Sequence, residues 1–180
     1  MTDPTTDLND FFDYIWSTTE GYVYLPVEYQ GKWTSFMFKW PRQKPAVVRH
    51  VLKWASLTAN VFYAPALFHS ARPLKENVLG TWVLWVDFDG NAPETWEDNA
   101  RKIPEPTLRV QSSIPKHEHC YWRLDEFLSD VSTIDDRNRA LAYTLGADTS
   151  GWDADQILRP PHTINHKRGV PVTIKDWTDQ

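Results

Sequence analysis

The chain has 180 residues, of which 41% are hydrophobic and 24% are charged, a composition typical of a globular protein with a buried core. The 19 Lys and Arg against 24 Asp and Glu leave a net charge of −5, which excludes the uniformly basic surface of a histone-like protein. One cysteine, Cys120, excludes a disulfide framework and a multi-cysteine zinc site, so we expect no structural zinc and a reducing, cytoplasmic location. No apolar run approaches the about 18 residues of a membrane span, so we expect no membrane partner.

The first part of the chain alternates helical and extended patterns. Apolar residues first recur at helical spacing, and two aromatic, β-branched runs then flank a turn at Gly31, which predicts a hairpin. Pro65 makes the last strand of this part an edge strand or a bulged one. The expected elements are a helix over 7–19, strands over 22–29 and 33–40, a helix over 46–57 and a strand over 60–68.

The second part repeats this alternation and contains the densest apolar strand of the chain, which ends in two aspartates. The expected elements are strands over 81–89, 108–113, 118–124, 156–158 and 170–174, with helices over 93–102 and 133–145. Hairpin connections beside longer crossovers indicate an α+β fold with a mostly antiparallel sheet. Most of the 10 tryptophans fall within these elements, which favours core packing; base stacking by one or two of them is the alternative.

The first candidate site is the strand end Asp87-Phe88-Asp89. Successive strand side chains point to opposite faces, so Asp87 and Asp89 share one face and Phe88 packs on the other. Two neighbouring carboxylates repel each other unless a cation lies between them, and Mg²⁺ or Mn²⁺ prefers such oxygen ligands. The alternative is a solvated strand end, because Asp89-Gly90 is also ordinary turn chemistry.

The second candidate site is the stretch SSIPKHEHCYWRL, residues 112–124. His117 and His119 share one strand face, and together with two hydroxyls and Lys116 they could form a cradle for a phosphate. A polar hairpin loop is the alternative, and a His-x-His zinc site is a further one.

The third candidate site is the segment LGADTSGWDADQILRPPHTINHK, residues 145–167, where acids precede a basic, proline-rich loop. Such a segment could hold both a metal ion and a triphosphate, although a surface loop of mixed charge is the alternative. The acids are Asp148, Asp153 and Asp155, and the basic residues that follow are Arg159, His162, His166, Lys167 and Arg168.

Taken together, the three segments resemble the motifs of the archaeo-eukaryotic primase superfamily, and in particular the primase-polymerase domains of plasmid and phage replication proteins. The first motif corresponds to Asp87-Phe88-Asp89, the second to Ser113 with His119-Cys120-Tyr121-Trp122, and the third to Asp148 with the loop LRPPHTINHK at 158–167. In that loop Pro161-His162 stand where the family usually has Pro-Gly. Ser113 and His119 are one residue further apart than the family spacing, so His117 is a rival for the histidine role.

The resemblance implies an RRM-like catalytic sheet over about residues 76–180, an N-terminal α/β lobe over about residues 1–75, and an active site in the cleft between them. The 180 residues would form a single primase-polymerase catalytic domain, which could be the N-terminal part of a longer replication protein. The implied partners are a DNA template and primer, an NTP or dNTP, and a helicase in the same chain or in trans. The implied setting is the cytoplasm of a bacterial, archaeal or phage-infected cell.

The implied reaction is template-directed nucleotidyl transfer by a two-metal mechanism, with two Mg²⁺ or Mn²⁺ ions held by Asp87, Asp89 and Asp148. Asp153 and Asp155 are substitutes for the third acid. By the same resemblance, the residues that would contact the incoming nucleotide are Ser113, His119, Arg159 and, as a weaker candidate, Lys167. A basic strip at Arg42, Lys44, Arg49 and Lys53, with a second group at Arg101 and Lys102, would hold the template.

Two other functions remain open from the residues alone. Nucleotide-sugar transferases also end an apolar strand in Asp-x-Asp to bind Mn²⁺ on a diphosphate, but they do not require the Ser…His strand or the basic loop. A non-catalytic replication initiator that binds DNA through the same fold is the other alternative, and the three intact acids argue against it.

Overall fold

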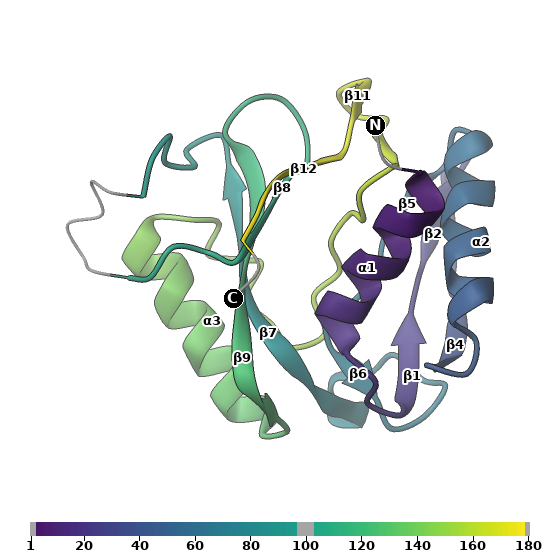
Figure 1. Ribbon diagram of the computed structural model, residues 1–180, viewed down its shortest axis with the longest axis horizontal. Coiled ribbons are helices and arrows are strands. Elements are labelled where there is room, and N and C mark those ends of the chain that lie inside the picture. Colours follow the sequence, from purple (N-terminus) through teal and green to yellow (C-terminus); the bar gives the residue numbers. More distant parts are fainter. Residues whose placement is uncertain (1–2, 97–102, 179–180) are drawn as a thin grey trace.

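The computed structural model describes residues 3–96 and 103–178, which form an α+β fold around a seven-stranded antiparallel sheet (Figure 1). The strand order is β12-β8-β9-β7-β6-β1-β4, so the expected mostly antiparallel sheet is confirmed. Its strands are β1 (Gly21–Tyr24), β4 (Met37–Trp40), β6 (Leu67–Phe68), β7 (Val78–Asp89), β8 (Leu108–Gln111), β9 (His117–Leu128) and β12 (Thr173–Trp177). The helices are α1 (Pro4–Trp16), α2 (Lys44–Ser56) and α3 (Val131–Leu145), with a 3-10 turn, η1, at Lys75–Asn77.

Two smaller sheets complete the fold. One has the order β3-β2-β5, and the other is the two-stranded pair β10-β11. Their strands are β2 (Val27–Tyr29), β3 (Lys32–Thr34), β5 (Asn60–Val61), β10 (Ile164–Asn165) and β11 (Val170–Pro171).

The hairpin predicted around Gly31 is confirmed, but it is divided between two sheets. The two paired stretches of the hairpin keep the same register, from Gly21↔Trp40 to Tyr24↔Met37 and from Val27↔Thr34 to Tyr29↔Lys32. Pro26 interrupts the outgoing strand, where it can donate no ladder hydrogen bond. The base of the hairpin, β1 and β4, therefore joins the large sheet, while its tip, β2 and β3, pairs with β5.

The single strand expected over 60–68 is wrong, because the chain forms two short strands in different sheets. β5 lies at the edge of the small sheet and β6 lies within the large one. Pro65 lies in the irregular segment between them, since proline cannot donate to a continuous ladder. This break leaves Phe62 and Tyr63 outside any strand, where they face the segment that follows α3.

Three other expected elements also differ from the structure. Residues 93–96 are not helical, and the Pro93 carbonyl accepts a hydrogen bond from Arg109 Nη2 at 3.0 Å; residues 97–102 of that expected helix lie outside the described residues. Instead of a strand over 156–158, Leu158 forms one isolated antiparallel bridge to Tyr63. The final strand is divided into β11 and β12.

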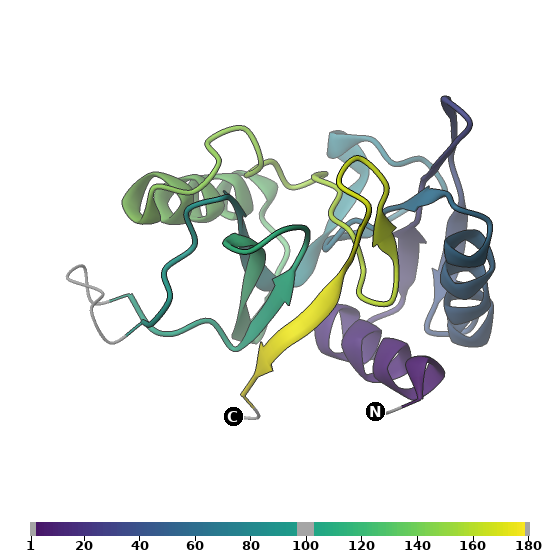
Figure 2. The same ribbon diagram turned by 90° about the horizontal axis from the view of Figure 1, so that it is seen from above.

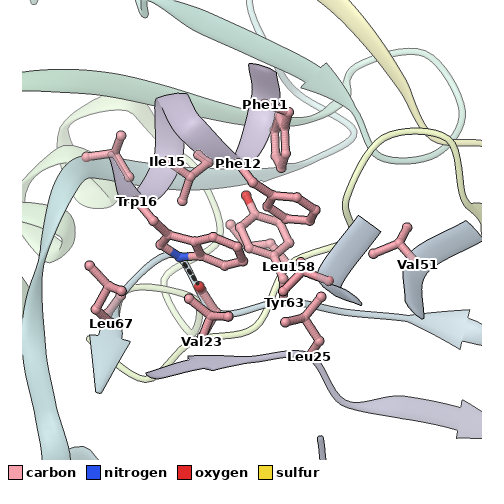
Figure 3. Packing of buried hydrophobic residues seen from close by; sticks show 14 of the residues in the cluster. Phe11, Phe12, Ile15, Trp16, Val23, Leu25, Val51, Tyr63, Leu67 and Leu158 are labelled. Carbon is pink, nitrogen blue, oxygen red and sulfur yellow. Dashed lines mark hydrogen bonds between the residues drawn. The ribbon is translucent and has the colours of Figure 1, made fainter. Parts of the chain in front are cut away.

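The core lies on both faces of β7. On one face, the apolar stripe of α1 belongs to the same buried cluster as Val83 and Trp85 of β7. Figure 3 shows this stripe facing Val23, Leu25 and Leu67 of the N-terminal half. Trp16 at the end of this stripe stacks on Phe12 with ring centroids 4.6 Å apart, and its indole N–H donates to the Ala64 carbonyl at 3.1 Å. On the other face, Phe88 packs beneath α3. No helix in the described ranges is long and apolar enough to cross a bilayer.

Candidate active site

The end of β7 and the start of β9 bring the first two candidate sites together. The two strands pair antiparallel with Asp87 opposite His119 and Asp89 opposite His117, and residues directly opposite each other point to the same face. Phe88 is wholly buried on the other face, as the strand periodicity predicts. Two acids and two histidines therefore share one face at the end of the sheet.

The two acid–histidine pairs are not equivalent. Asp89 is exposed, and its Oδ1 lies 2.8 Å from His117 Nδ1, so the two form a close pair at the surface. His119 is buried, and its Nε2 lies 3.7 Å from Asp87 Oδ1, which is too long for a hydrogen bond. His119 contacts the Arg159 backbone and its Nδ1 has no hydrogen-bond partner, whereas His117 Nδ1 is engaged with Asp89.

Asp148 is attached to β7 through the backbone. β6 pairs with β7 only near its beginning, so the later part of that edge of β7 is covered by α3 and the loop after it. Asn138 Oδ1 accepts the Trp85 N–H at 3.0 Å, and the Asp148 N–H donates to the Asp87 carbonyl at 2.7 Å. The Ser150 hydroxyl and N–H both donate to the Asp148 carboxylate.

The substitutes for the third acid lie in other surroundings. Asp153 is engaged in an ion pair with Lys75 at 2.6 Å. Asp155 makes no hydrogen bond or ion pair with any other described residue. Of the three acids in this segment, Asp148 is the one that the structure joins directly to Asp87.

The carboxylates influence one another electrostatically. Burial, followed by the negative charges of Asp148 and Asp89, raises the pKa of Asp87 to about 7, against the opposing effect of Arg159. Burial, followed by the positive charge of Arg159, lowers the pKa of His119 to about 3. At neutral pH the site therefore contains a neutral imidazole beside a carboxyl group that is only partly ionised.

Arg159 reaches this site because the loop after α3 is fixed to the N-terminal half of the chain. Tyr63 and Leu158 exchange two backbone hydrogen bonds of 2.8 Å, and the loop crosses from α3 to that half of the molecule (Figure 2). The Arg159 guanidinium lies 4.7 Å from the Phe62 ring centroid. Burial lowers the pKa of Arg159, and the charges of Asp87 and Glu28 oppose that shift.

Buried polar atoms without partners concentrate in these segments. The described part of the chain has seven such side-chain atoms, and five of them belong to the second and third candidate sites. Buried polar groups are normally hydrogen-bonded, so these unpaired atoms are available to a polar ligand or to water. The five atoms are Ser113 Oγ, His119 Nδ1, Arg159 Nε, Asn165 Oδ1 and His166 Nε2.

The acids fit a divalent cation by their chemistry. Carboxylate oxygens are the ligands that Mg²⁺ and Mn²⁺ prefer, and the pKa of Asp87 is raised by burial and then by neighbouring negative charge that a cation would offset. Within residues 3–96 and 103–178, no three His, Cys, Asp or Glu side chains converge closely enough to hold an ion. Asp89 Oδ1 is paired with His117 and the Asp148 carboxylate accepts from Ser150, so convergence of the three acids on one ion requires these side chains to rearrange.

The remaining candidate residues lie further from the acids. Lys167 is exposed in the turn between β10 and β11, and His162 Nε2 lies 3.0 Å from Asp7 of α1. In the proposed template strip, Lys44 is paired with Asp13, while Arg49 and Lys53 are exposed. Arg101 and Lys102 lie outside the described residues.

Sequence reasoning missed two features of the site: the contact of Arg159 with the Phe62 ring, and the hydrogen bond from the Trp85 N–H to Asn138 Oδ1. Phe62 carries no local signal, because its role depends on pairing with a segment far along the chain. Asn138 lies within an ordinary helical pattern, and only its complete burial distinguishes it.

The sequence matches no family model and no curated protein, whereas the fold has close counterparts among solved structures. The AEP domain of the primase-polymerase of cyanophage S-2L superposes with a TM-score of 0.72 at 13% identity, over 97% of this chain and 91% of that one. The fold is that of primase-polymerase catalytic domains. The catalytic domain of primase RepB′ in complex with initiator DNA gives 0.72 at 16% identity over 99% and 87% of the two chains. A second structure of primase RepB′ gives 0.71 at 15% identity, and this chain spans 57% of its length.

Proposed function

We propose that this chain is a template-directed nucleotidyltransferase, a DNA primase or polymerase of plasmid or phage replication. The observation that carries the proposal is that three residues assigned to the nucleotide by the motif resemblance, Ser113, His119 and Arg159, each have a buried polar side-chain atom without a partner. Two of them, His119 and Arg159, lie near Asp87. The primase-polymerase fold supports it, because the same motif order then lies on the same architecture.

In this proposal the incoming nucleotide binds through its phosphates. Ser113 Oγ–H and Arg159 Nε–H would donate to phosphate oxygens, and the bond from Arg159 is charge-assisted. His119, uncharged at neutral pH, would contact the same phosphates through Nδ1. Lys167 is a weaker candidate for this contact because it lies exposed on a turn.

The acids would position the reacting groups. Asp87, Asp89 and Asp148 would hold Mg²⁺ or Mn²⁺, which when bound lowers the pKa of the attacking hydroxyl and offsets charge on the phosphates. In the reaction, the 3′-oxygen of the primer forms a bond to the α-phosphorus, the bond to pyrophosphate breaks, and the hydroxyl proton leaves. Asp89 must exchange its contact with His117 to take part.

The wider assignment follows from the same proposal. Residues 1–75 would form the N-terminal lobe and residues 76–180 the catalytic sheet, with the DNA template and primer and an NTP or dNTP meeting between them. The proposed partners also include a helicase, in the same natural chain or in trans. The proposed location is the cytoplasm of a bacterial, archaeal or phage-infected cell.

Primer extension on a labelled primer-template with Mg²⁺ or Mn²⁺ tests the proposal. We expect the parent chain to add the nucleotide complementary to the template, and the Asp87→Ala/Asp89→Ala variant to add none. An Asp125→Asn/Glu126→Gln variant, which removes two exposed acids from β9, is the control and should extend like the parent. Equal activity in parent and Asp87→Ala/Asp89→Ala, or none in either, would contradict the proposal.

A further inference from the structure

An aromatic pair extends the environment of Arg159 to the tip of the N-terminal hairpin. Trp33 on β3 stacks on Phe62, with ring centroids 5.2 Å apart and planes inclined by 28°. The Arg159 guanidinium lies against the same Phe62 ring at 4.7 Å. Phe62 therefore connects a surface tryptophan to the arginine that we assign to the incoming nucleotide.

The side chain of Trp33 lies on the surface, where it can bind a ligand, and not in the core. Its side chain is 60% exposed, whereas Trp16, Trp40 and Trp85 are almost completely buried. β3 is exposed along its whole length, and Phe62 covers one face of the indole. A large aromatic ring that is left open to solvent beside a polar site is typical of a stacking platform.

Positive charge lies on the neighbouring hairpin. The His166 N–H donates to Asn60 Oδ1 at 3.3 Å, which attaches the β10-β11 turn to β5, two residues before Phe62. Lys167 and Arg168 follow in this turn; both are exposed, and neither forms an ion pair with another described residue. Since the chain as a whole is acidic, these two cations, on a hairpin attached to the small sheet that carries Trp33, complement a phosphate backbone.

We propose that the open face of Trp33 stacks on a base of the single-stranded DNA template, whose backbone follows Lys167 and Arg168. The inference rests on the proposed function, because it takes Arg159 as the boundary of the nucleotide site. Phe62 separates Trp33 from Arg159, so the platform lies beyond the phosphates of the incoming nucleotide. Lys167, the weaker candidate for the incoming nucleotide, contacts the template backbone in this arrangement, and together with Arg168 it suits a polyanion longer than one nucleotide. Stacking of this kind accepts any base, as a template contact must.

Fluorescence anisotropy with labelled oligothymidine, without nucleotide or divalent metal, tests the platform. We expect Trp33→Ala to weaken DNA binding by about fivefold or more, the effect of one lost base–aromatic stack. Trp33→Phe keeps an aromatic ring and should retain most of the affinity. Tyr143→Ala is the matched control, because Tyr143 is 63% exposed on α3 and has no place in the platform. Oligothymidine affinity equal to that of the parent in Trp33→Ala would overturn the inference.

A parallel titration with a fluorescent nucleoside triphosphate shows whether Trp33 stacks on a template base or on the base of the incoming nucleotide. Unchanged triphosphate affinity in Trp33→Ala supports the template assignment; weaker triphosphate binding with unchanged DNA binding overturns it. The inference and the proposed function can fail separately. Extension by the parent with no DNA-binding defect in Trp33→Ala refutes only the platform, and a DNA-binding defect in a chain that extends no primer refutes only the polymerase.

Discussion

Asp87 combines two properties that oppose each other. Its carboxyl is partly buried beside Asp148 and Asp89, and these surroundings raise its pKa to about 7, yet the proposed chemistry requires it ionised. A divalent cation removes the conflict, because its charge favours the ionised form. The acidic site is therefore arranged at a cost to the stability of the metal-free protein.

This cost predicts a pH-dependent gain in stability for Asp87→Asn. The pKa of Asp87 is raised on folding, so between about pH 4 and 7 the folded chain holds a proton that the unfolded chain has lost, and this group's contribution to stability falls as pH rises. At pH 8 without divalent metal, we expect Asp87→Asn to be more stable than the parent by on the order of 1 kcal/mol, and near pH 4 to differ little. Urea denaturation of both proteins at the two pH values measures this difference in the free energy of unfolding.

Asp125→Asn is the control for that comparison, because Asp125 is exposed on β9. It should match the parent at both pH values, and added Mg²⁺ at pH 8 should stabilise the parent and the control more than Asp87→Asn. An Asp87→Asn variant that loses stability between pH 4 and pH 8 as steeply as the parent would contradict the assigned ionisation.

For the two histidines, the sequence predicts the strand face on which they lie but not the partners of each ring. The alternation of strand residues places His117 and His119 on one face with the acids, and the structure confirms that arrangement. Which histidine keeps an unpaired ring nitrogen depends on burial and on the pairing of His117 with Asp89, and neither is encoded in the spacing.

The free edge of β7 is the feature on which the position of Asp148 depends. Trp85 and Asp87 each have a backbone group on that edge that no neighbouring strand pairs, and Asn138 and Asp148 satisfy them. Backbone groups buried without partners are costly, so α3 and its following loop are held against the strand.

Asn138→Ala should therefore destabilise the protein. Asn138 is completely buried, and its loss leaves the Trp85 N–H unpaired, so we expect the free energy of unfolding to fall by about 1–3 kcal/mol in urea denaturation. Asn9→Ala is the control, because Asn9 makes its hydrogen bond to the Thr5 carbonyl at the surface and should cost about 0.5 kcal/mol or less. Equal effects of the two substitutions would show that the edge of β7 does not need Asn138.

The strands that carry the acids and histidines could be predicted because their patterns are long and local. β7 and β9 lie close to the predicted ranges, and the two aspartates end β7 as expected. The division of residues 60–68 between two sheets could not be predicted in the same way. Pro65 indicated an irregularity, but the choice of partners for β5 and β6 depends on strands distant in sequence.

For the molecule as a whole, the bridge between Tyr63 and Leu158 is the decisive long-range contact. It connects the N-terminal sheets to the loop that carries Arg159, and through Phe62 it places Trp33 beside the same site. The three motifs alone cover only the second half of the chain, so they predict nothing about the contribution of Phe62 and Trp33 to the surroundings of Arg159. The N-terminal half therefore contributes aromatic surface to a site whose acids all come from the second half.

Primer extension by Asp148→Asn and Asp153→Asn tests the central assignment most directly. The two aspartates lie in the same loop, but Asp148 is joined to Asp87 and Asp153 is paired with Lys75. We predict that Asp148→Asn lowers the rate of nucleotide addition by at least about a hundredfold, as expected for loss of a metal ligand, and that Asp153→Asn stays within a fewfold of the parent. Retained activity in Asp148→Asn, with loss in Asp153→Asn, would contradict the account.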